Sequence, residues 1–466
     1  MSQSEQPRDY RRYSYWLETC GDDLTPRPGL DGPIQADVAI LGAGFTGLWT
    51  AYYLKRARPE LAIVVVEKEI AGFGASGRNG GFVTPGLQVS LGKLAARFGR
   101  EKARAQQLAM FETVDEVGRV VGEEGIDCGY HKGGYLRVAR GPQHLAALEA
   151  SARTSAEFGL ADHYQRLDAR ETNERVQIAG ALGATFNPQC ALVQPAKLVR
   201  GLARAVERLG VTIYEGTPVT EFVAGVNPTL ITPRGEVRAG TLVLAGESYL
   251  TRLPQLNRQL IPVYSLITLT EPLSQADWEE IGWEGRECLS SPRLTVDYLS
   301  KTADGRIAFG GRGAPYHYGS TIEDAYDRHE PTHAALRQAT VEWFPRLTNV
   351  AFTHAWGGPL GMPRDWLPTM SYDRAAGIAS SRGYTGQGVA TANLAGRVLT
   401  DLILERETPL TELPLVNHQS PDWEPEPLRW LGVRYVQRGY QRLDEQSERS
   451  GRAPNGRTLV ERLGSH

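Results

Sequence analysis

Cysteine is scarce in this chain of 466 residues, which has only Cys20, Cys128, Cys190 and Cys288, all far apart. No C-x-x-C pair occurs, so neither a disulfide framework nor a cysteine-based zinc site is expected. Such scarcity is typical of proteins from a reducing compartment.

Neither sign of charge is in excess, and long apolar runs are missing. The 51 Lys and Arg residues against 54 Asp and Glu residues give a net charge of −3, and the arginines are scattered. This balance gives no electrostatic reason to expect a nucleic-acid partner. No run is apolar for long enough to cross a bilayer, and residues 1–12 lack the apolar core of a secretory signal. We therefore expect a cytoplasmic enzyme without a membrane span, built from two or three domains because of its length.

The strongest local signal is a glycine-rich turn between a strand and a helix. Residues 37–41 form a short apolar run typical of a buried parallel strand, and residues 48–54 are typical of a helix. Gly42 permits the tight turn, Gly44 lets the backbone approach a pyrophosphate, and Gly47 lets the helix press against the sheet. The turn, which we predict to bind a dinucleotide, consists of Gly42, Ala43, Gly44, Phe45, Thr46 and Gly47.

A second apolar strand, residues 62–66, ends at Glu67, twenty residues after Gly47. A carboxylate at this place accepts hydrogen bonds from a ribose diol and repels a 2′-phosphate, which favours FAD or NAD over NADP. Lys68 beside it belongs to the same predicted site. The alternative, a plain turn beside a solvated strand end, does not explain the complete strand–turn–helix–strand context.

The segment 72–82 distinguishes FAD from NAD. An NAD-binding unit would continue into another helix and strand, whereas dense glycine lets the backbone lie against a large flat ligand. Ser76, Arg78 and Asn79 have donors suited to a pyrophosphate or to ring carbonyls. The predicted cofactor residues of this segment are Gly74, Ala75, Ser76, Arg78, Asn79, Gly80 and Gly81.

These blocks resemble the D-amino-acid-oxidase-like FAD oxidoreductases, and within that group the γ-glutamylputrescine oxidase branch. The resemblance begins at residues 14–17 and runs to about 412. Its later blocks are 191–198, 239–246, 356–368 and 383–389. It implies further cofactor contacts at Val219, Ala245, Gly246, Gly361, Gly386, Gln387, Gly388 and Val389.

The last block has a physical reason of its own. Its glycines lead into a helix expected over residues 390–403, whose free N–H groups point at whatever lies before them. The resemblance places that helix N-terminus at the N1–C2 carbonyl edge of the isoalloxazine, where negative charge develops on reduction.

The spacing of the blocks predicts an α/β fold in which an FAD-binding βαβ domain, a glutathione-reductase-like Rossmann unit, is interleaved with an α+β substrate domain carrying a mostly antiparallel sheet. The expected segments are an N-terminal extension (1–35), three FAD-binding pieces (36–84, 195–255 and 356–412), two substrate-domain pieces (85–194 and 256–355) and a C-terminal tail (413–466). In the tail we expect one helix near 427–435 and a frayed end after Gln446.

The resemblance also implies the chemistry. Bound FAD would take a hydride from the carbon next to a neutral amine, leaving an imine, and O2 or another acceptor would reoxidise it with release of H2O2 if O2 is used. The expected substrates are γ-glutamylputrescine-like amines, N-methyl amines or amino acids. No general base is required, so no catalytic residue is assigned. Candidate substrate contacts, each with ordinary packing as the alternative, are Tyr264, Tyr298, Arg312, Trp356 and Tyr384.

Two departures from sarcosine-oxidase-type relatives keep alternatives open. Those relatives attach FAD to a cysteine, but residues 358–361 contain none and residues 74–81 contain no histidine, so non-covalent FAD is expected. They also have a lysine that assists O2 on the strand aligned with 306–309, and the nearest one here is Lys301. A dehydrogenase using a protein or quinone acceptor, a degenerate FAD-fold binding module and an NAD-dependent dehydrogenase are the alternatives; the last is disfavoured by the loop 72–81.

One motif points to chemistry that we do not expect. Residues 329–333 match the zinc pattern H-E-x-x-H, which requires both histidines on one face of a continuous helix. Pro331 favours a helix start instead, so the histidines should straddle a loop–helix junction. We expect no metal there, and the sequence does not constrain the oligomeric state.

Overall fold

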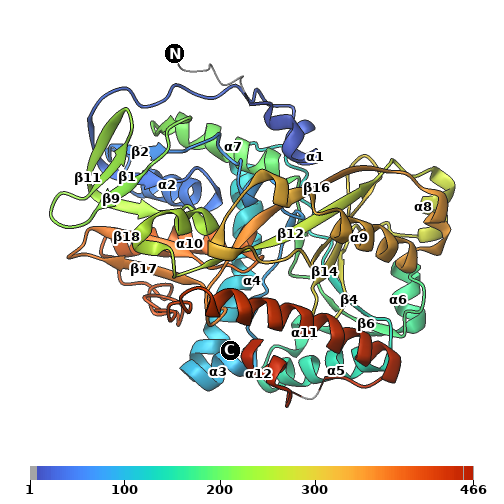
Figure 1. The fold of residues 1–466 in the computed structure, drawn as a ribbon. Helices are drawn as coiled ribbons and strands as arrows, with labels where there is room; N and C mark the ends of the chain where they lie inside the picture. The colour runs from blue at the N-terminus through green and yellow to red at the C-terminus, as the bar shows by residue number, and fades with distance from the viewer. Residues whose placement is uncertain (1–7, 455, 465–466) are drawn as a thin grey trace.

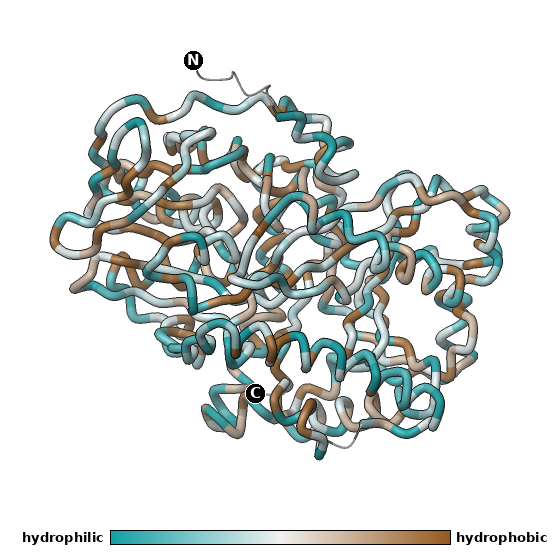
Figure 2. The backbone as a smooth tube through the Cα atoms, viewed as in Figure 1, coloured by the Kyte–Doolittle hydropathy of each residue, from teal (hydrophilic) through white to brown (hydrophobic). Residues whose placement is uncertain are grey.

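Two eight-stranded sheets organise the chain, one in each of two lobes (Figure 1). The computed structural model describes residues 8–454 and 456–464. Apolar residues run along the strands of both sheets and polar residues cover the outer loops and helices (Figure 2). The predicted pairing of an α/β lobe with a second, sheet-containing lobe is confirmed.

The first sheet belongs to the lobe that contains the turn predicted to bind a dinucleotide, called the cofactor lobe below. Its strands, in order across the sheet, are β17 (Thr369–Asp373), β18 (Ile378–Arg382), β11 (Gly235–Leu244), β1 (Ile34–Leu41), β2 (Ile63–Val66) and β8 (Thr212–Tyr214), with β10 (Thr229–Thr232) and β9 (Glu221–Val223) extending β11. β1 lies in the centre and pairs in parallel with β2 and β11. Because parallel strands end at the same edge, the turn after β1, Glu67 after β2 and Ala245 after β11 come together there.

The second sheet belongs to the other lobe, called the substrate lobe below. It is antiparallel except for one pair of strands. Its strands, in order, are β16 (Phe352–Met362), β12 (Ile261–Thr270), β15 (Ile307–Arg312), β14 (Asp297–Lys301), β13 (Cys288–Ser290), β4 (Tyr135–Ala139), β6 (Gly183–Asn187) and β5 (Gln165–Asp168). Only β13 and β4 are parallel. β16 pairs with β12 along its whole length, so residues 356–362 hydrogen-bond within this sheet. A short pair, β3 (Phe82–Val83) and β7 (Ala191–Leu192), lies beside it.

Helices cover both sheets. The helices are α1 (Tyr15–Glu18), α2 (Phe45–Ala57), α3 (Leu91–Phe98), α4 (Arg100–Glu123), α5 (Pro142–Glu157), α6 (Ala169–Arg175), α7 (Pro195–Arg208), α8 (Gln275–Ile281), α9 (Glu330–Trp343), α10 (Gly388–Ile403), α11 (Leu428–Ser450) and α12 (Leu459–Gly464). α10 and α7 pack on α2, and α4 packs on α10. No helix in the described ranges is long and apolar enough to cross a membrane.

The C-terminal tail is longer and better ordered than its sequence indicated. The expected helix near 427–435 continues to Ser450, and α12 packs back on it. The prediction of a frayed end after Gln446 was wrong for the described residues, because α11 continues to Ser450 and α12 packs on it; positions 455, 465 and 466 lie outside the described residues. Asp444 accepts hydrogen bonds from the backbone N–H groups of Leu294 and Thr295, and the Ser447 hydroxyl donates to the Arg452 carbonyl.

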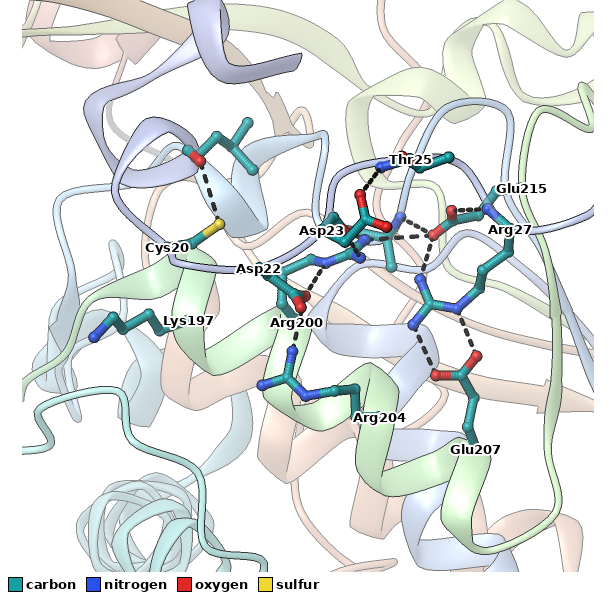
Figure 3. A network of polar contacts seen from close by, with 12 residues as sticks. Cys20, Asp22, Asp23, Thr25, Arg27, Lys197, Arg200, Arg204, Glu207 and Glu215 are labelled. Atoms are coloured by element: carbon teal, nitrogen blue, oxygen red, sulfur yellow. Dashed lines mark hydrogen bonds and ion pairs between the residues drawn. The ribbon is translucent and has the colours of Figure 1, made fainter. Parts of the chain in front are cut away.

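The N-terminal extension is attached to the cofactor lobe by a network of buried and half-buried charges (Figure 3). Glu215 accepts hydrogen bonds from the Arg27 guanidinium at 2.8 Å and from the Ala71 backbone N–H at 2.7 Å. Arg200 on α7 donates to the Asp22 carboxylate at 2.7 Å and to the Asp23 carbonyl. The extension is thereby held next to Ala71, where the glycine-rich segment begins.

Candidate cofactor and substrate site

A cavity of about 590 Å³ lies between the two lobes. On the first sheet it is lined by the turn after β1, residues 66–69 after β2 and residues 245–250 after β11. The loop 72–80 and the start of α10 line its middle, and residues of β12, β14, β15 and β16 line the other end. Its wall carries a carboxylate, Glu67, from the first sheet and a guanidinium, Arg312, from the second.

The glycines of the first turn stand where side chains would collide. A Cβ at Gly47 would lie 2.0 Å from the Gly42 carbonyl oxygen, and a Cβ at Gly42 would lie 2.8 Å from the Ala245 carbonyl oxygen. Gly42 also has a φ of 103°, which favours glycine. These contacts let α2 start directly against the strand ends and leave its N-terminus open to the cavity.

Glu67 lies at one end of the cavity, and its carboxylate is held by backbone N–H groups. The N–H of Ala43 and the N–H of Glu69 each donate to it at 2.9 Å. It lies deep in the protein, with its accessible surface lining the cavity, and burial raises its pKa to about 7. A ligand hydroxyl that donates to it would favour the ionised form.

Two helix N-termini face the cavity without side-chain caps. Neither α2, with Gly44 at its N-cap, nor α10, with Gln387, has a capping side chain. In α2 the Phe45 N–H donates to the Ser76 hydroxyl at 2.9 Å. The first-turn N–H groups and helix dipoles favour negative charge, so this wall suits a pyrophosphate beside α2 and an electron-rich ring beside α10.

The opposite end of the cavity contains a guanidinium without an acidic partner. Arg312, at the end of β15, donates to the Thr385 carbonyl and forms no ion pair within the described chain. Desolvation lowers its pKa to about 10, so it remains charged at neutral pH. Tyr298 lies beside it, packed so closely on the backbone that a Cβ at Gly310 would lie 2.1 Å from its ring.

Comparison with known protein families fits this geometry. Residues 37–402 match the model of the family described as FAD dependent oxidoreductase, abbreviated DAO, which is well over half of the chain. The chain belongs to this DAO family. The predicted family, the assignment as an FAD-dependent oxidoreductase and the FAD cofactor are therefore confirmed.

Individual relatives of this DAO-family enzyme cover most of its length. It is 30% identical over 402 residues to the probable oxidoreductase OrdL of Haemophilus influenzae, covering 84% of this chain and 88% of the relative. It is 29% identical over 393 residues to the γ-glutamylputrescine oxidoreductase of Escherichia coli, with the same coverage. Among solved structures, glycine oxidase from Geobacillus kaustophilus superposes with a TM-score of 0.66 at 21% identity, covering 82% of this chain and 99% of that one.

Most of the cofactor residues predicted for the DAO-family enzyme meet in this one cavity. Those that line it are Gly42, Gly44, Phe45, Thr46, Glu67, Lys68, Gly74, Ala75, Ser76, Arg78, Asn79, Gly80, Val219, Ala245, Gly246, Gly386, Gln387, Gly388 and Val389. Four others, Ala43, Gly47, Gly81 and Gly361, are not among the lining residues. The cavity wall therefore combines a carboxylate, which suits a ribose hydroxyl, with two uncapped helix N-termini, which suit negative charge.

Two of the predicted donors are occupied within the protein. Arg78 donates to Asp327 at 2.6 Å and to the Tyr249 hydroxyl at 2.8 Å. The Asn79 amide donates to the carbonyls of Ala75 and Ser76 at 3.0 Å. Both side chains therefore shape the glycine-rich loop, and Arg78 joins it to the substrate lobe.

The five candidate substrate residues separate into two groups. Tyr298, Arg312 and Tyr384 line the cavity, whereas Tyr264 and Trp356 do not. Strand alternation explains Tyr264, because its neighbour Ser265 faces the cavity and Tyr264 faces the other side of β12. The Trp356 indole donates to the Arg78 carbonyl at 2.9 Å and is buried beneath the glycine-rich loop.

Several lining residues were missed by the sequence analysis. Arg8 of the N-terminal extension contacts Glu69 at 2.7 Å and also Asp324, so it bridges the two lobes over the cavity. Glu247 accepts hydrogen bonds from the N–H groups of Gly361, Gly383 and Tyr384. For Glu247 the sequence held one usable signal, its place directly after Gly246. For Arg8 it held none, because nothing in the sequence links Arg8 to the distant Asp324.

Lys301 and the H-E-x-x-H histidines lie outside the cavity. Lys301 donates to the Trp283 carbonyl at 2.9 Å and lies over the Trp278 ring. His329 is the N-cap of α9 and bonds to Thr332, while His333, inside the helix, bonds to the Asp327 carbonyl. The histidines straddle the helix start as predicted, and the described residues contain no cluster of three or more metal-binding side chains.

Proposed function

We propose that this enzyme oxidises the carbon–nitrogen bond of a small amine that also carries a carboxylate, in the cytoplasm. The observation that supports this most directly is Arg312, a cation on the cavity wall without an acidic partner within the described chain. A charge away from bulk water is stable when it is paired, and a guanidinium binds a carboxylate through two parallel hydrogen bonds. A substrate carboxylate would supply that partner.

The names of the relatives support the same substrate class. They include a γ-glutamylputrescine oxidoreductase and a glycine oxidase. γ-Glutamylputrescine, glycine and N-methylated amino acids all combine an amine with a carboxylate. We infer that the substrate is one of these types, and the shape of the cavity beside Tyr298 selects among them.

FAD supplies the redox chemistry when bound, by accepting a hydride from the carbon next to the nitrogen, leaving an imine, and by passing the electrons to O2 to give H2O2. The chain's own residues position and shield the reacting atoms. Arg312 would fix the carboxylate, and Tyr298, whose pKa is raised to about 12 by burial, stays protonated and bonds to the Ser265 hydroxyl at 3.0 Å. The N-terminus of α10 stabilises negative charge on its side of the cavity.

We further propose that FAD is held without a covalent bond. The described residues that line the cavity include neither histidine nor cysteine, the side chains expected for a covalent link. The electron acceptor has a second candidate, a protein or a quinone. The position of Lys301 outside the cavity favours it, because the lysine expected to assist O2 is missing from the site.

The test begins with the visible spectrum of the purified enzyme and of the supernatant after acid precipitation. Flavin bands that pass into the supernatant support non-covalent FAD. An anaerobic screen then follows the loss of flavin absorbance with amino acids, N-methyl amino acids, γ-glutamylputrescine and amines that lack a carboxylate. Bleaching by the last group alone would contradict the proposal. Readmitting air and measuring H2O2 separates an oxidase from a dehydrogenase.

A further inference from the structure

The helix pair α11–α12 lies beyond the residues 37–402 shared with the family and carries a concentrated apolar surface. Nine large hydrophobic side chains are exposed in the described chain, and five of them are on this pair. They are Leu428, Leu431, Tyr435, Leu459 and Leu463. Isolated exposed leucines are ordinary, but a contiguous group marks an interaction surface.

A row of unpaired arginines accompanies the apolar side chains. Arg434, Arg438 and Arg442 are spaced four residues apart on α11, and none has an ion-pair partner in the part of the chain that the structure describes. Residues 428–443 contain four arginines and no acidic residue, in a chain whose net charge is −3. The fourth, Arg429, pairs with Glu426 at 3.2 Å. The local surface is therefore positive.

Two of the five exposed apolar side chains, Leu431 and Tyr435, share one groove with the arginine row. Trp430, Leu431, Tyr435 and Val460 line a groove of about 460 Å³ between the two helices, together with the three unpaired arginines. The other face of α11 is already occupied by the substrate lobe, where Gln437 bonds to the Tyr316 N–H and Asp444 caps the 294–295 turn. The groove is on the side left free.

We propose that this α11–α12 face docks on an anionic lipid bilayer. Basic side chains repeated along a helix, interleaved with leucine and tyrosine, combine attraction to anionic headgroups with shallow insertion of apolar groups. A second copy of the chain fits less well. A two-fold contact through this face would bring the arginine rows of the two copies together, and residues 428–443 contain no acidic residue to compensate them.

Docking would bring the substrate end of the cavity close to the membrane. Burial raises the pKa of Tyr440 on α11, and Arg312 lies close enough for its charge to oppose that rise. The side-chain amide of Gln441 would lie 4.0 Å from a Cβ placed at Gly313. A bilayer on the outer face would thus be separated from this segment by about one helix diameter, roughly 10 Å. The docking itself does not depend on the proposed substrate, and its test measures binding alone.

The test is sedimentation of the FAD-loaded protein with vesicles of phosphatidylglycerol and phosphatidylcholine in equal parts, and with phosphatidylcholine alone. We expect binding to the anionic vesicles only, with release at about 0.5 M salt because of screening. The variant R434Q/R438Q/R442Q should bind roughly 100-fold more weakly. The matched variant R56Q/R58Q/R238Q removes the same charge from the cofactor lobe and should bind as the wild type does.

Three kinds of result would overturn the proposal. Equal sedimentation with neutral vesicles, or equal loss in both triple variants, would remove the role of the arginine row. Binding to polyglutamate but not to vesicles would assign the face to an acidic protein. A dimer in light scattering that R434Q/R438Q/R442Q converts to monomer, without vesicle binding, would assign it to a second copy. If the triple variant loses its flavin spectrum, the role of the arginine row is tested instead with the single variant R438Q and with the salt titration of the wild type. Unchanged binding of R438Q together with salt-independent binding of the wild type would then overturn the proposal.

Discussion

Replacing Arg312 by glutamine tests the substrate end of the cavity most directly. The guanidinium is half-buried on the cavity wall, donates to the Thr385 carbonyl and has no ion-pair partner within the described chain, so a bound carboxylate would supply one. Removing one partner of such a pair costs about 2–5 kcal/mol. At 1.4 kcal/mol per factor of ten, kcat/KM should fall by about 30-fold to about 4,000-fold.

The assay compares two substrates rather than two proteins alone. The rate of flavin bleaching is measured anaerobically with the best carboxylate-bearing amine and with its carboxamide analogue. We expect the full loss with the carboxylate, and a change of no more than a few-fold with the carboxamide, which has no charge to lose. Arg312→Lys should be intermediate, because an ammonium keeps the charge but lacks the planar fork.

An equal loss for both substrates would refute the reasoning. Arg312 would then matter through its bond to Thr385, which precedes the glycine turn into α10, and not through a substrate carboxylate. Arg252→Gln is the control, since Arg252 lines the same cavity but donates to the Ile322 carbonyl near the other end. It should leave the ratio between the two substrates unchanged. The FAD content of each variant confirms that the cofactor site is intact.

Three further predictions concern the cofactor. Arg8→Ala breaks the partly exposed bridge over the cavity. FAD release, measured by fluorescence, should become several-fold faster at low salt but change little at high salt, because salt screens exposed ion pairs. Arg12→Ala is the charge-matched control. The pKa of Glu67 is raised to about 7, and ribose hydroxyls favour its ionised form, so FAD binding should release a proton. The affinity of the apoprotein for FAD should therefore rise with pH up to about 7, by at most tenfold per pH unit. In the same titration, Glu67→Gln should flatten this rise. Gly47→Ala should abolish FAD binding and lower the melting temperature, whereas Gly92→Ala, on an exposed helix with nothing within 4 Å, should keep FAD and leave that temperature equal or slightly higher.

The sequence allowed prediction of the parts of the site that consist of backbone. Each glycine block predicted a place where main chain approaches another group, and the collisions at Gly42 and Gly47 give the reason. The strand before the first turn and the helix after it were predicted because their apolar spacing is local. The blocks must meet at one edge of a parallel sheet although long stretches of chain separate them. Their order therefore indicated that these stretches form a second lobe.

The side-chain contacts of the site depend on strand pairing and on segments distant in sequence, which explains the misses. Tyr264 and Ser265 are neighbours in the chain, and only the register of β12 decides which one faces the cavity. Arg8 meets Asp324 across more than three hundred residues. Arg78, predicted as a cofactor donor, does line the cavity, and what its sequence position could not show is the pairing with Asp327 in the other lobe.

The loops around the cavity share a device that no local pattern reveals. They leave backbone N–H groups without partners in a sheet or helix, and buried N–H groups must be satisfied. Three carboxylates do this: Glu67 accepts from Ala43 and Glu69, Glu215 accepts from Arg27 and Ala71, and Glu247 accepts from Gly361, Gly383 and Tyr384. Each one stands just after a strand of the first sheet and reaches a different segment, so each joins separate pieces of the chain.

Glu247 adopts a φ of 48° to make these contacts, a conformation that side-chain-bearing residues seldom take. This indicates that its three hydrogen bonds outweigh the strain. The glycines therefore make room for the cavity, and the three carboxylates hold the loops around it together.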